Sequence, residues 1–390
     1  MAEPERLSKG KGKGKKGSES SRTEEEQGGE EGEGGAEPSK KRPRPGSASD
    51  TSVLAERTGT CDIWALVASL GRIASSAASA VGLGRPTKRV VILVDNGSLK
   101  ASSTLGLRQV ARLLQEHLCT MGGSSPLSVI AASARFSDRI DPGELGGERA
   151  RTVQELLRDL RSQRFAEVVL LPVFFGPSAM VADFIPKQVT VVRSEPGPPM
   201  PNMSLAPTLI CGCPFNCPGG GSDNRVAQML FGRIQEAVKT NGFGPNPAIA
   251  VVDHGSPTPA VARCREQVTM QLSSLIAAAA LAGAPLKPRV VLGCCMERRE
   301  GAEYDFNGEL LEKVLEENPI FKEGEVIVAL MFLQPGRHAG PDGDLDQIVK
   351  KAAAGGSKAT VVMTEVIGAH EILVEVLAER LGQAFRPAGW

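Results

Sequence analysis

The sequence is short of histidine and of aromatic residues. Among 390 residues there are four histidines, one tyrosine and two tryptophans, and aromatic side chains make up 4% of the chain. With so few imidazoles, a histidine that directly follows a predicted strand becomes a candidate for metal or proton chemistry. Apolar residues amount to 41% of the chain, which is enough for ordinary buried cores.

The chain also lacks net charge and a regular cysteine pattern. Its 45 basic and 45 acidic residues cancel, so no global field would recruit a nucleic acid or an anionic membrane. The eight cysteines are irregularly spaced, which favours a reducing compartment over a secreted disulfide scaffold. No Walker-type phosphate loop and no secretory signal are found. We expect neither a nucleic-acid partner nor a stable membrane span.

Low-complexity sequence makes up residues 1–60, which are rich in Gly, Ser, Glu and Lys and almost free of large apolar residues. Such a segment cannot bury enough surface to offset chain entropy, so we predict a disordered tail. Residues 61–87 are mildly apolar, and no acidic residue follows position 62 within them. This composition fits either an organelle transit segment or a short amphipathic linker helix.

From residue 88 onward, apolar runs alternate with helical stretches. Continuous apolar runs predict strands buried on both faces, and therefore parallel sheets with crossover helices. Segments such as STLGLRQVARLLQEHL and EILVEVLAERLGQA show helical periodicity. The predicted strands are RVVILVDNGS, LSVIAASAR, AEVVLLPVFFG, QVTVVRSEP, AIAVVDHGS, KPRVVLGCCME, EVIVALMFLQPG and KATVVMTEVIG. The pattern indicates an α/β protein with four β–α units, repeated twice.

Matching motifs indicate an internal duplication. VDNGS and VDHGS follow the first strand of each half, and PVFFGPSAM and MFLQPGRH follow the third. Asn96 and Met180 are 84 residues apart (180 − 96), as are His254 and His338 (338 − 254). The Gly- and Pro-rich stretch TNGFGPNPA forms the natural boundary. The predicted halves are residues 88–243 and 247–390.

Three polar residues follow the first three strands of the second half: His254, Glu297 and His338. In open parallel α/β sheets, ligands bind outside the carboxyl ends of the strands. Two imidazoles and a carboxylate suit a divalent first-row metal, and neutral imidazole accepts a proton near neutral pH. Each of them alone would be an ordinary loop side chain. Together they are predicted to be both the metal ligands and the catalytic residues.

These motifs resemble the sirohydrochlorin chelatase family, small ATP-independent type II tetrapyrrole chelatases of sirohaem and cobalamin synthesis. The resemblance lies in VDHGS, the glutamate after the second strand, and FLQPGRH followed by an acidic helix start. CCMERREGAEYDFNGELLE and EVIGAHEILVEVLAERL are also similar to matching parts of that family. The resemblance runs from about residue 88 to the end. It implies two tandem chelatase-like half-domains (flavodoxin-like, three-layer αβα), each with a four-stranded parallel sheet, facing across a cleft.

The resemblance also implies an activity, the insertion of Fe²⁺ or Co²⁺ into sirohydrochlorin. His254, Glu297 and His338 would hold the metal, and one of the histidines would accept the displaced pyrrole protons. Arginines suit the many carboxylates of sirohydrochlorin. The expected substrate-binding residues are Ser256, Arg263, Arg298, Arg299 and Arg337. Two alternatives remain: a metal- or tetrapyrrole-binding protein without turnover, and a scaffold role that depends on the tail.

The first half has lost the corresponding side chains. Asn96 and Met180 replace the histidines, and the glutamate position is basic, either Arg135 by strand alignment or Arg139 by constant offset. Asparagine cannot accept a proton, a thioether is a poor ligand for such metals, and a guanidinium repels a cation. We expect one active site in a monomeric pseudo-dimer, with Arg135 or Arg139 facing the substrate's carboxylates.

Two further expectations concern a cysteine-rich loop and localisation. CGCPFNCPGGG offers Cys211, Cys213 and Cys217 as ligands for an iron–sulfur cluster, although C-x-C-x3-C matches no standard cluster signature. The acid-free segment and the tail favour, by analogy, a plastid over the cytoplasm.

Overall fold

The computed structural model describes residues 88–121, 127–163, 165–210 and 223–385. All of them belong to one compact unit of the chain, Arg57–Trp390. The predicted tail, the segment 61–87 and the three loop cysteines lie outside the described residues. Within the described part, no helix combines the length and apolar character needed to cross a bilayer.

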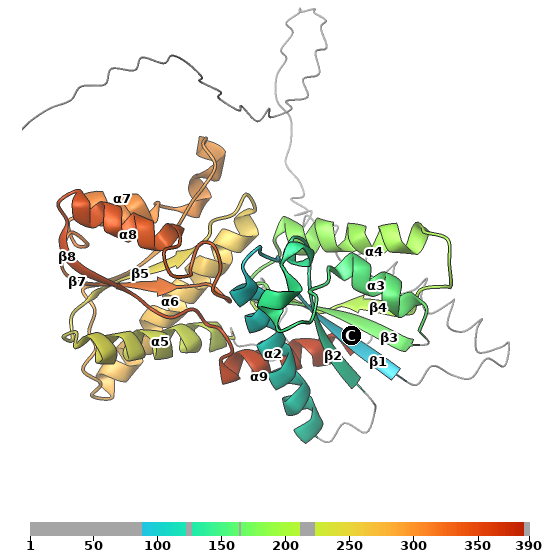
Figure 1. Ribbon diagram of the computed structural model, residues 1–390. Coiled ribbons are helices and arrows are strands. Elements are labelled where there is room, and N and C mark those ends of the chain that lie inside the picture. The colour runs from blue at the N-terminus through green and yellow to red at the C-terminus, as the bar shows by residue number, and fades with distance from the viewer. Residues whose placement is uncertain (1–87, 122–126, 164, 211–222, 386–390) are drawn as a thin grey trace, which may run out of the picture. The chain divides into compact units, whose positions relative to one another are not determined.

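The first half contains a four-stranded parallel sheet with strand order β2-β1-β3-β4. The order places β1 in the interior of the sheet, with β2 and β4 at its edges (Figure 1). The elements are β1 (Lys88–Asp95), α2 (Ala101–Thr120), β2 (Leu127–Ser133), the 3₁₀ turns η1 (Ser137–Arg139) and η2 (Pro142–Leu145), α3 (Val153–Arg161), β3 (Phe165–Pro172), the π-helical turn η3 (Met180–Phe184), α4 (Ile185–Ser194) and β4 (Asn202–Leu205).

The second half repeats this order as β6-β5-β7-β8, again with all strands parallel. The duplication expected from the sequence is therefore present in the sheet topology. The first half ends with α5 (Arg225–Asn241). The elements of the second half are β5 (Ala248–Asp253), α6 (Pro259–Leu281), β6 (Val290–Cys295), η4 (Ala302–Asn307), α7 (Leu311–Glu317), β7 (Glu323–Leu330), α8 (Asp344–Ala354), β8 (Lys358–Met363) and α9 (Glu371–Phe385).

The central strands are buried on both faces because each contains an unbroken run of apolar residues. In β1, Val91 and Leu93 belong to one apolar cluster, while Val90, Ile92 and Val94 belong to another on the opposite face. Successive strand residues point to opposite faces, so a continuous Val/Ile/Leu run supplies both cores. This confirms the expectation of parallel sheets covered by helices on both sides.

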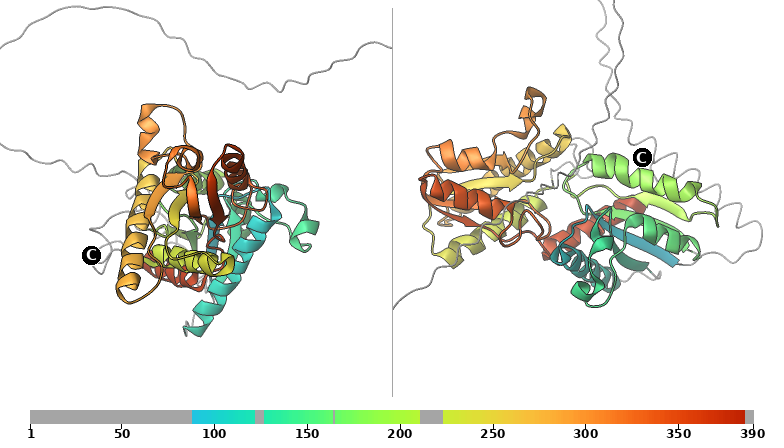
Figure 2. Two further views of the ribbon diagram at one scale, coloured as in Figure 1. Left: turned by 90° about the vertical axis from the view of Figure 1, so that its left-hand side faces the viewer. Right: turned by 45° about the horizontal axis from the view of Figure 1, so that its top comes forward.

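The two halves exchange helices. α5 packs on α6, β7 and β8, whereas α9, at the end of the second half, packs on α2 and β3 of the first. Figures 1 and 2 show α9, in red, beside α2, in blue-green. One apolar cluster accordingly contains Val91 of β1, Ile249 of β5 and Leu377 of α9. The halves therefore share one apolar core. Residues from both sides of the predicted boundary near residue 245 contribute to it.

One predicted strand was wrong. QVTVVRSEP lies largely in helix α4, and the fourth strand of the first half is the short β4. Its β-branched composition suggested a strand, but Ile185, Val189 and Val192 recur at helical spacing and are all buried. Pro186 occupies the first turn of α4, where a missing N–H is tolerated. Packing of this apolar stripe outweighs the intrinsic preference of valine and threonine for strands.

Candidate functional site

The three predicted ligands lie beyond the ends of adjacent strands. His254 directly follows β5, Glu297 follows β6 after one intervening residue, and His338 lies in the segment between β7 and α8. The strands β6, β5 and β7 are neighbours in the sheet and run parallel. Their carboxyl ends therefore share one edge, and the loops that follow them converge.

The structure brings these three side chains together. The Nε2 atom of His254 is 3.3 Å from Oε1 of Glu297. The ring centroids of His254 and His338 are 4.7 Å apart, with an edge-to-face angle of 85°. His254 Nε2 and Glu297 thus form an ion pair whenever the imidazole is protonated, and a bound cation would replace that proton.

Contacts at Nδ1 orient both imidazoles. Nδ1 of His338 lies 2.6 Å from Oδ2 of Asp344, in the first turn of α8, and Nδ1 of His254 lies 3.2 Å from the carbonyl oxygen of Gly255. Both partners are acceptors. The Nδ1–H tautomer satisfies the contact of His338 with Asp344 and leaves its Nε2 without a proton, whereas His254 has an acceptor at each ring nitrogen, Gly255 O at Nδ1 and Glu297 Oε1 at Nε2. A hydrogen-bonded Nδ1–H with a free Nε2 is the usual arrangement of a metal-binding histidine.

The cluster is open rather than preformed. The side chains of His254 and Glu297 are 46% and 62% exposed, and that of His338 is 30% exposed. Among the described residues, no group of three His, Cys, Asp or Glu side chains is arranged so that it could hold a metal ion. The three side chains therefore lie near one another without the closed coordination sphere of a structural metal site.

A buried ion pair holds the turn that carries His254. Arg265 of α6 is fully buried and donates from Nη1 to Asp253 Oδ1 at 2.9 Å and from Nη2 to the carbonyl oxygen of Asn307 at 2.8 Å. Asn307 in turn accepts from the backbone N–H of Ser256 and donates to its carbonyl oxygen, each at 2.9 Å. Burial raises the pKa of the Asp253 carboxyl, and Arg265 opposes that rise.

Sequence reasoning missed Arg265, Asn307 and Asp344. Arg265 lies one helix away from Asp253, and Asn307 lies in η4, more than 50 residues after His254. Asp344 had a visible signal, since an acidic residue opening a helix six positions after a histidine is well placed to hold its Nδ1.

Arg298 and Arg299 follow Glu297 and line a cavity of about 390 Å³ beside it. Arg298 Nη1 lies 3.0 Å from Asp305 Oδ1 and donates to the carbonyl oxygen of Gly308 at 3.1 Å. The Arg299 guanidinium lies over the ring of Tyr304, 5.7 Å from its centroid. Both arginines are thus engaged within the loop that they line.

The other predicted substrate-binding residues differ in availability. Arg337 is 77% exposed, with Nε 3.6 Å from Asp344 Oδ2. Arg263 is exposed on α6. The Ser256 hydroxyl instead accepts a hydrogen bond from the N–H of Thr258 at 3.0 Å, at the start of α6, so its contact has a structural role.

The first half has the same backbone frame with different side chains. The N–H of Ala134 donates to Asp95 O at 2.8 Å, as the N–H of Met296 donates to Asp253 O at 2.8 Å. The following residues, Arg135 and Glu297, are therefore structural equivalents, and alignment by strands identifies the right arginine.

Glycine positions support this equivalence. Gly97 and Gly255 have φ values of +87° and +88°, and a β-carbon on either would collide with the carbonyl oxygen of Arg135 or Glu297, respectively. Met180 stands at the position equivalent to His338. It packs against the apolar cluster that lies between the first sheet and the helices α3 and α4.

His370 has a capping role outside the cluster. Its Nδ1 accepts a hydrogen bond from the N–H of Ile372 at 3.2 Å, at the start of α9. Burial and the nearby Arg233 lower the pKa of His370, which keeps the ring neutral and able to accept.

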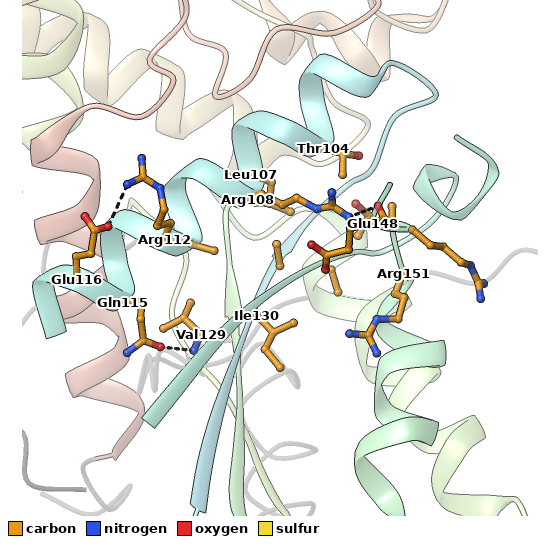
Figure 3. Close-up of a pocket in the computed structure, with 16 residues that line it drawn as sticks. Thr104, Leu107, Arg108, Arg112, Gln115, Glu116, Val129, Ile130, Glu148 and Arg151 are labelled. Atoms are coloured by element: carbon orange, nitrogen blue, oxygen red, sulfur yellow. Dashed lines mark hydrogen bonds and ion pairs between the residues drawn. The ribbon is translucent and has the colours of Figure 1, made fainter. Parts of the chain in front are cut away.

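A larger cavity, of about 440 Å³, lies in the first half alone, between α2, β2 and residues 148–151 (Figure 3). Gln115 closes part of the open edge of β2. It accepts from the N–H of Val129 at 2.9 Å and donates to the carbonyl oxygen of Leu127 at 3.1 Å. None of the three clustered ligands lines this cavity.

The fold and the cluster define an α/β protein of two fused halves, one of which carries a histidine–glutamate cluster at its strand ends. Residues 297–384 match the family model described as CbiX. The match lies within the second half, from Glu297 onward, and confirms the family resemblance seen in the sequence. No curated protein matches the chain.

Several solved structures are similar to the chain. SirB from Bacillus subtilis with Fe³⁺ is 17% identical, with a TM-score of 0.48, covering 76% of this chain and 95% of that one. The sirohydrochlorin chelatase SirB from Bacillus subtilis subspecies spizizenii with cobalt is 16% identical, with a TM-score of 0.49, covering 77% and 97%. CbiX, described as the terminal enzyme of sirohaem biosynthesis in denitrifying bacteria, is 14% identical, with a TM-score of 0.42, covering 76% and 100%.

Proposed function

We propose that this protein inserts a divalent metal, Fe²⁺ or Co²⁺, into sirohydrochlorin without a nucleotide. The convergence of His254, Glu297 and His338, with His254 Nε2 against Glu297 and the two imidazole rings in edge-to-face contact, is the observation on which the proposal rests. The CbiX match and the names of the similar structures point to the same chemistry.

The chemistry is an exchange of a cation for protons. Two N–H bonds of the macrocycle break, the metal leaves the side chains that would hold it, and it is bound by the four ring nitrogens, with no change in oxidation state. Each imidazole that releases the metal regains its Nε2 lone pair, so His254 and His338 are suited to accept the two protons in turn. Glu297 offsets the charge of the arriving cation. Holding macrocycle and metal side by side lowers the entropic part of the barrier.

The site lies within one half, and the partner half is covalently attached. A single chain is therefore proposed to act as a monomer with one metal site. The first half would contribute a wall of the tetrapyrrole site and no metal ligand, because Asn96, Arg135 and Met180 replace the three ligands.

The test is anaerobic insertion of Fe²⁺ or Co²⁺ into sirohydrochlorin, followed by the absorbance change of the macrocycle. His254→Ala and His338→Ala should each lower the rate by about a hundredfold or more. His117→Ala, which removes an imidazole from α2, should leave it unchanged. If the wild type does not exceed the uncatalysed rate with either metal, the protein binds without turnover and the proposal is wrong.

A further inference from the structure

The end of β2 in the first half carries two arginines around one aromatic ring. The Arg135 guanidinium lies 4.9 Å from the ring centroid of Phe136 and 5.6 Å from that of Phe184, and Arg139 lies 5.7 Å from the Phe136 centroid. Cation–π contacts of this kind hold a guanidinium in place while leaving its N–H groups free for an anion.

The backbone at this point is strained. Phe136 has φ of 73°, a left-handed conformation that is rare for an aromatic residue. Such strain persists only where the surroundings enforce it, and it concentrates at functional sites. Here it places the Phe136 ring between Arg135 and Arg139.

Neither guanidinium is neutralised by the protein. In the same half, Arg149, Arg151 and Arg158 form ion pairs with Glu155, Asp159 and Glu195. By contrast, across the four described stretches of the chain, no carboxylate lies within ion-pair distance of Arg135 or Arg139, and both are exposed. Two unpaired cations held close together repel each other and favour an anionic ligand.

Hydrogen bonds connect the arginine loop to the loop of His338. The buried Ser137 accepts from the N–H of Ser98 at 3.3 Å and donates to Ser133 Oγ at 2.8 Å. A β-carbon placed on Gly336, two residues before His338, would lie 3.9 Å from Ser98 Oγ. Ser102 also donates to the carbonyl oxygen of Pro335 at 3.4 Å. The first-half loop that is bonded to the arginine loop thus contacts the segment that carries His338.

We infer that Arg135 and Arg139, held by Phe136 and Phe184, bind the carboxylate side chains of the tetrapyrrole while its ring nitrogens face the metal cluster of the second half. This inference rests on the proposed function. A guanidinium binds a carboxylate bidentately, and at the position of Glu297 it also keeps a cation out of the first half. The degenerate half would then have changed from binding metal to binding substrate.

The test is an anaerobic, metal-free titration of the full chain with sirohydrochlorin, followed by absorbance. Arg135→Ala and Arg139→Ala should each weaken binding by about tenfold, and Arg135→Lys should recover only part of the loss. The matched control is Arg112→Ala, which removes an exposed arginine from α2 and should not change affinity. Sirohydrochlorin with its carboxylates esterified should bind the wild type and the variants alike.

Co²⁺ binding, measured separately by its visible absorption, should be the same in the wild type and in the double variant that combines Arg135→Ala with Arg139→Ala. If the double variant binds sirohydrochlorin as tightly as Arg112→Ala does, the inference is wrong and the proposed function stands. If the wild type binds no sirohydrochlorin, both are overturned.

Discussion

Two equivalent buried aspartates differ in one neighbour. Asp253 has Arg265 twelve positions later in the chain, whereas Asp95 has the buried Leu107 at that spacing. One oxygen of Asp95, Oδ1, is buried without a hydrogen-bond partner among the described residues. Burial consequently raises the pKa of Asp95 to about 6, because hydrogen bonds from Ser133 and from the Gly97 backbone compensate for only part of the lost hydration of the carboxylate. The first half thus lacks the buried arginine as well as the histidine–glutamate cluster of the second half.

Asp95→Asn should stabilise the protein at neutral pH. Because the folded pKa is raised, Asp95 contributes stability that is fully present below pH 3.8 and is lost as the pH rises through about 6. Asparagine has the same size as aspartate but does not ionise, so the variant does not lose this stability as the pH rises. The free energy of unfolding of the variant, relative to the wild type, should therefore grow between about pH 4 and about pH 6 and level off above that, the total growth being on the order of 3 kcal/mol.

Urea denaturation at several pH values measures this difference. Asp183→Asn is the control, because its carboxylate is 60% exposed and should show no such growth. A constant difference between Asp95→Asn and the wild type across the range would contradict the assignment of a raised pKa.

At the scale of elements, the edge strand β2 is protected by a side chain of the preceding helix. An edge strand exposes unpaired N–H and C=O groups that invite pairing with another chain. Gln115 of α2 satisfies one of each, on Val129 and Leu127, and Ser133 at the other end donates its N–H to Arg151 O at 3.1 Å. A side chain of α2 thus forms hydrogen bonds with the β2 backbone that a further strand would otherwise form (Figure 3).

Gln115→Leu should lower the free energy of unfolding by about 1–2 kcal/mol and increase self-association. It keeps a side chain of similar size but leaves both backbone groups of β2 without their partner. Gln115→Glu retains the acceptor for Val129 and should lose less. Chemical denaturation and light scattering measure the two effects, and an unchanged denaturation midpoint in Gln115→Leu would show that water replaces the side chain at no cost.

At the scale of the whole molecule, the two halves contact each other through pairs of equivalent positions that carry side chains of different size. Gly176, in the segment after β3, packs on Cys264 of α6. At the equivalent place, Gln334 in the segment after β7 packs on Gly106 of α2. At both contacts a glycine faces a larger side chain. In the first contact the glycine lies in the loop, and in the second it lies in the helix. This complementary exchange, with the swapped helices α5 and α9, makes folding of each half depend on the other.

Gly176→Ala should destabilise the whole protein by about 1–3 kcal/mol, with a single cooperative transition. A β-carbon there would lie 2.7 Å from Cys264 Sγ and 3.6 Å from the Cα of Val261. Adding Cys264→Ala should recover part of the loss, since it removes the nearest atom. A thermodynamic cycle of the two single variants and the double variant measures this coupling. Additive effects would mean that the two residues do not contact each other.

Much of the architecture and the position of the histidine–glutamate cluster were determined by the sequence itself. Apolar runs in β1, β5 and β7 specify strands buried on both faces, and in a parallel sheet this places His254, Glu297 and His338 along one edge. The losses at Asn96 and Met180 could be recognised from equal spacing alone. These inferences succeed because strand burial and strand-end position are local properties of a repeated pattern.

Only the tertiary structure decided which elements pack together. Periodicity shows that α5 and α9 each bury an apolar face, but not that each covers a sheet across the duplication boundary, because an apolar stripe has no preference among similar partners. The same limit applies to Arg265 with Asn307, to Asp344 with His338, and to Arg135 as the equivalent of Glu297. These pairs are set by side-chain geometry between distant segments, which exists only after the chain has folded.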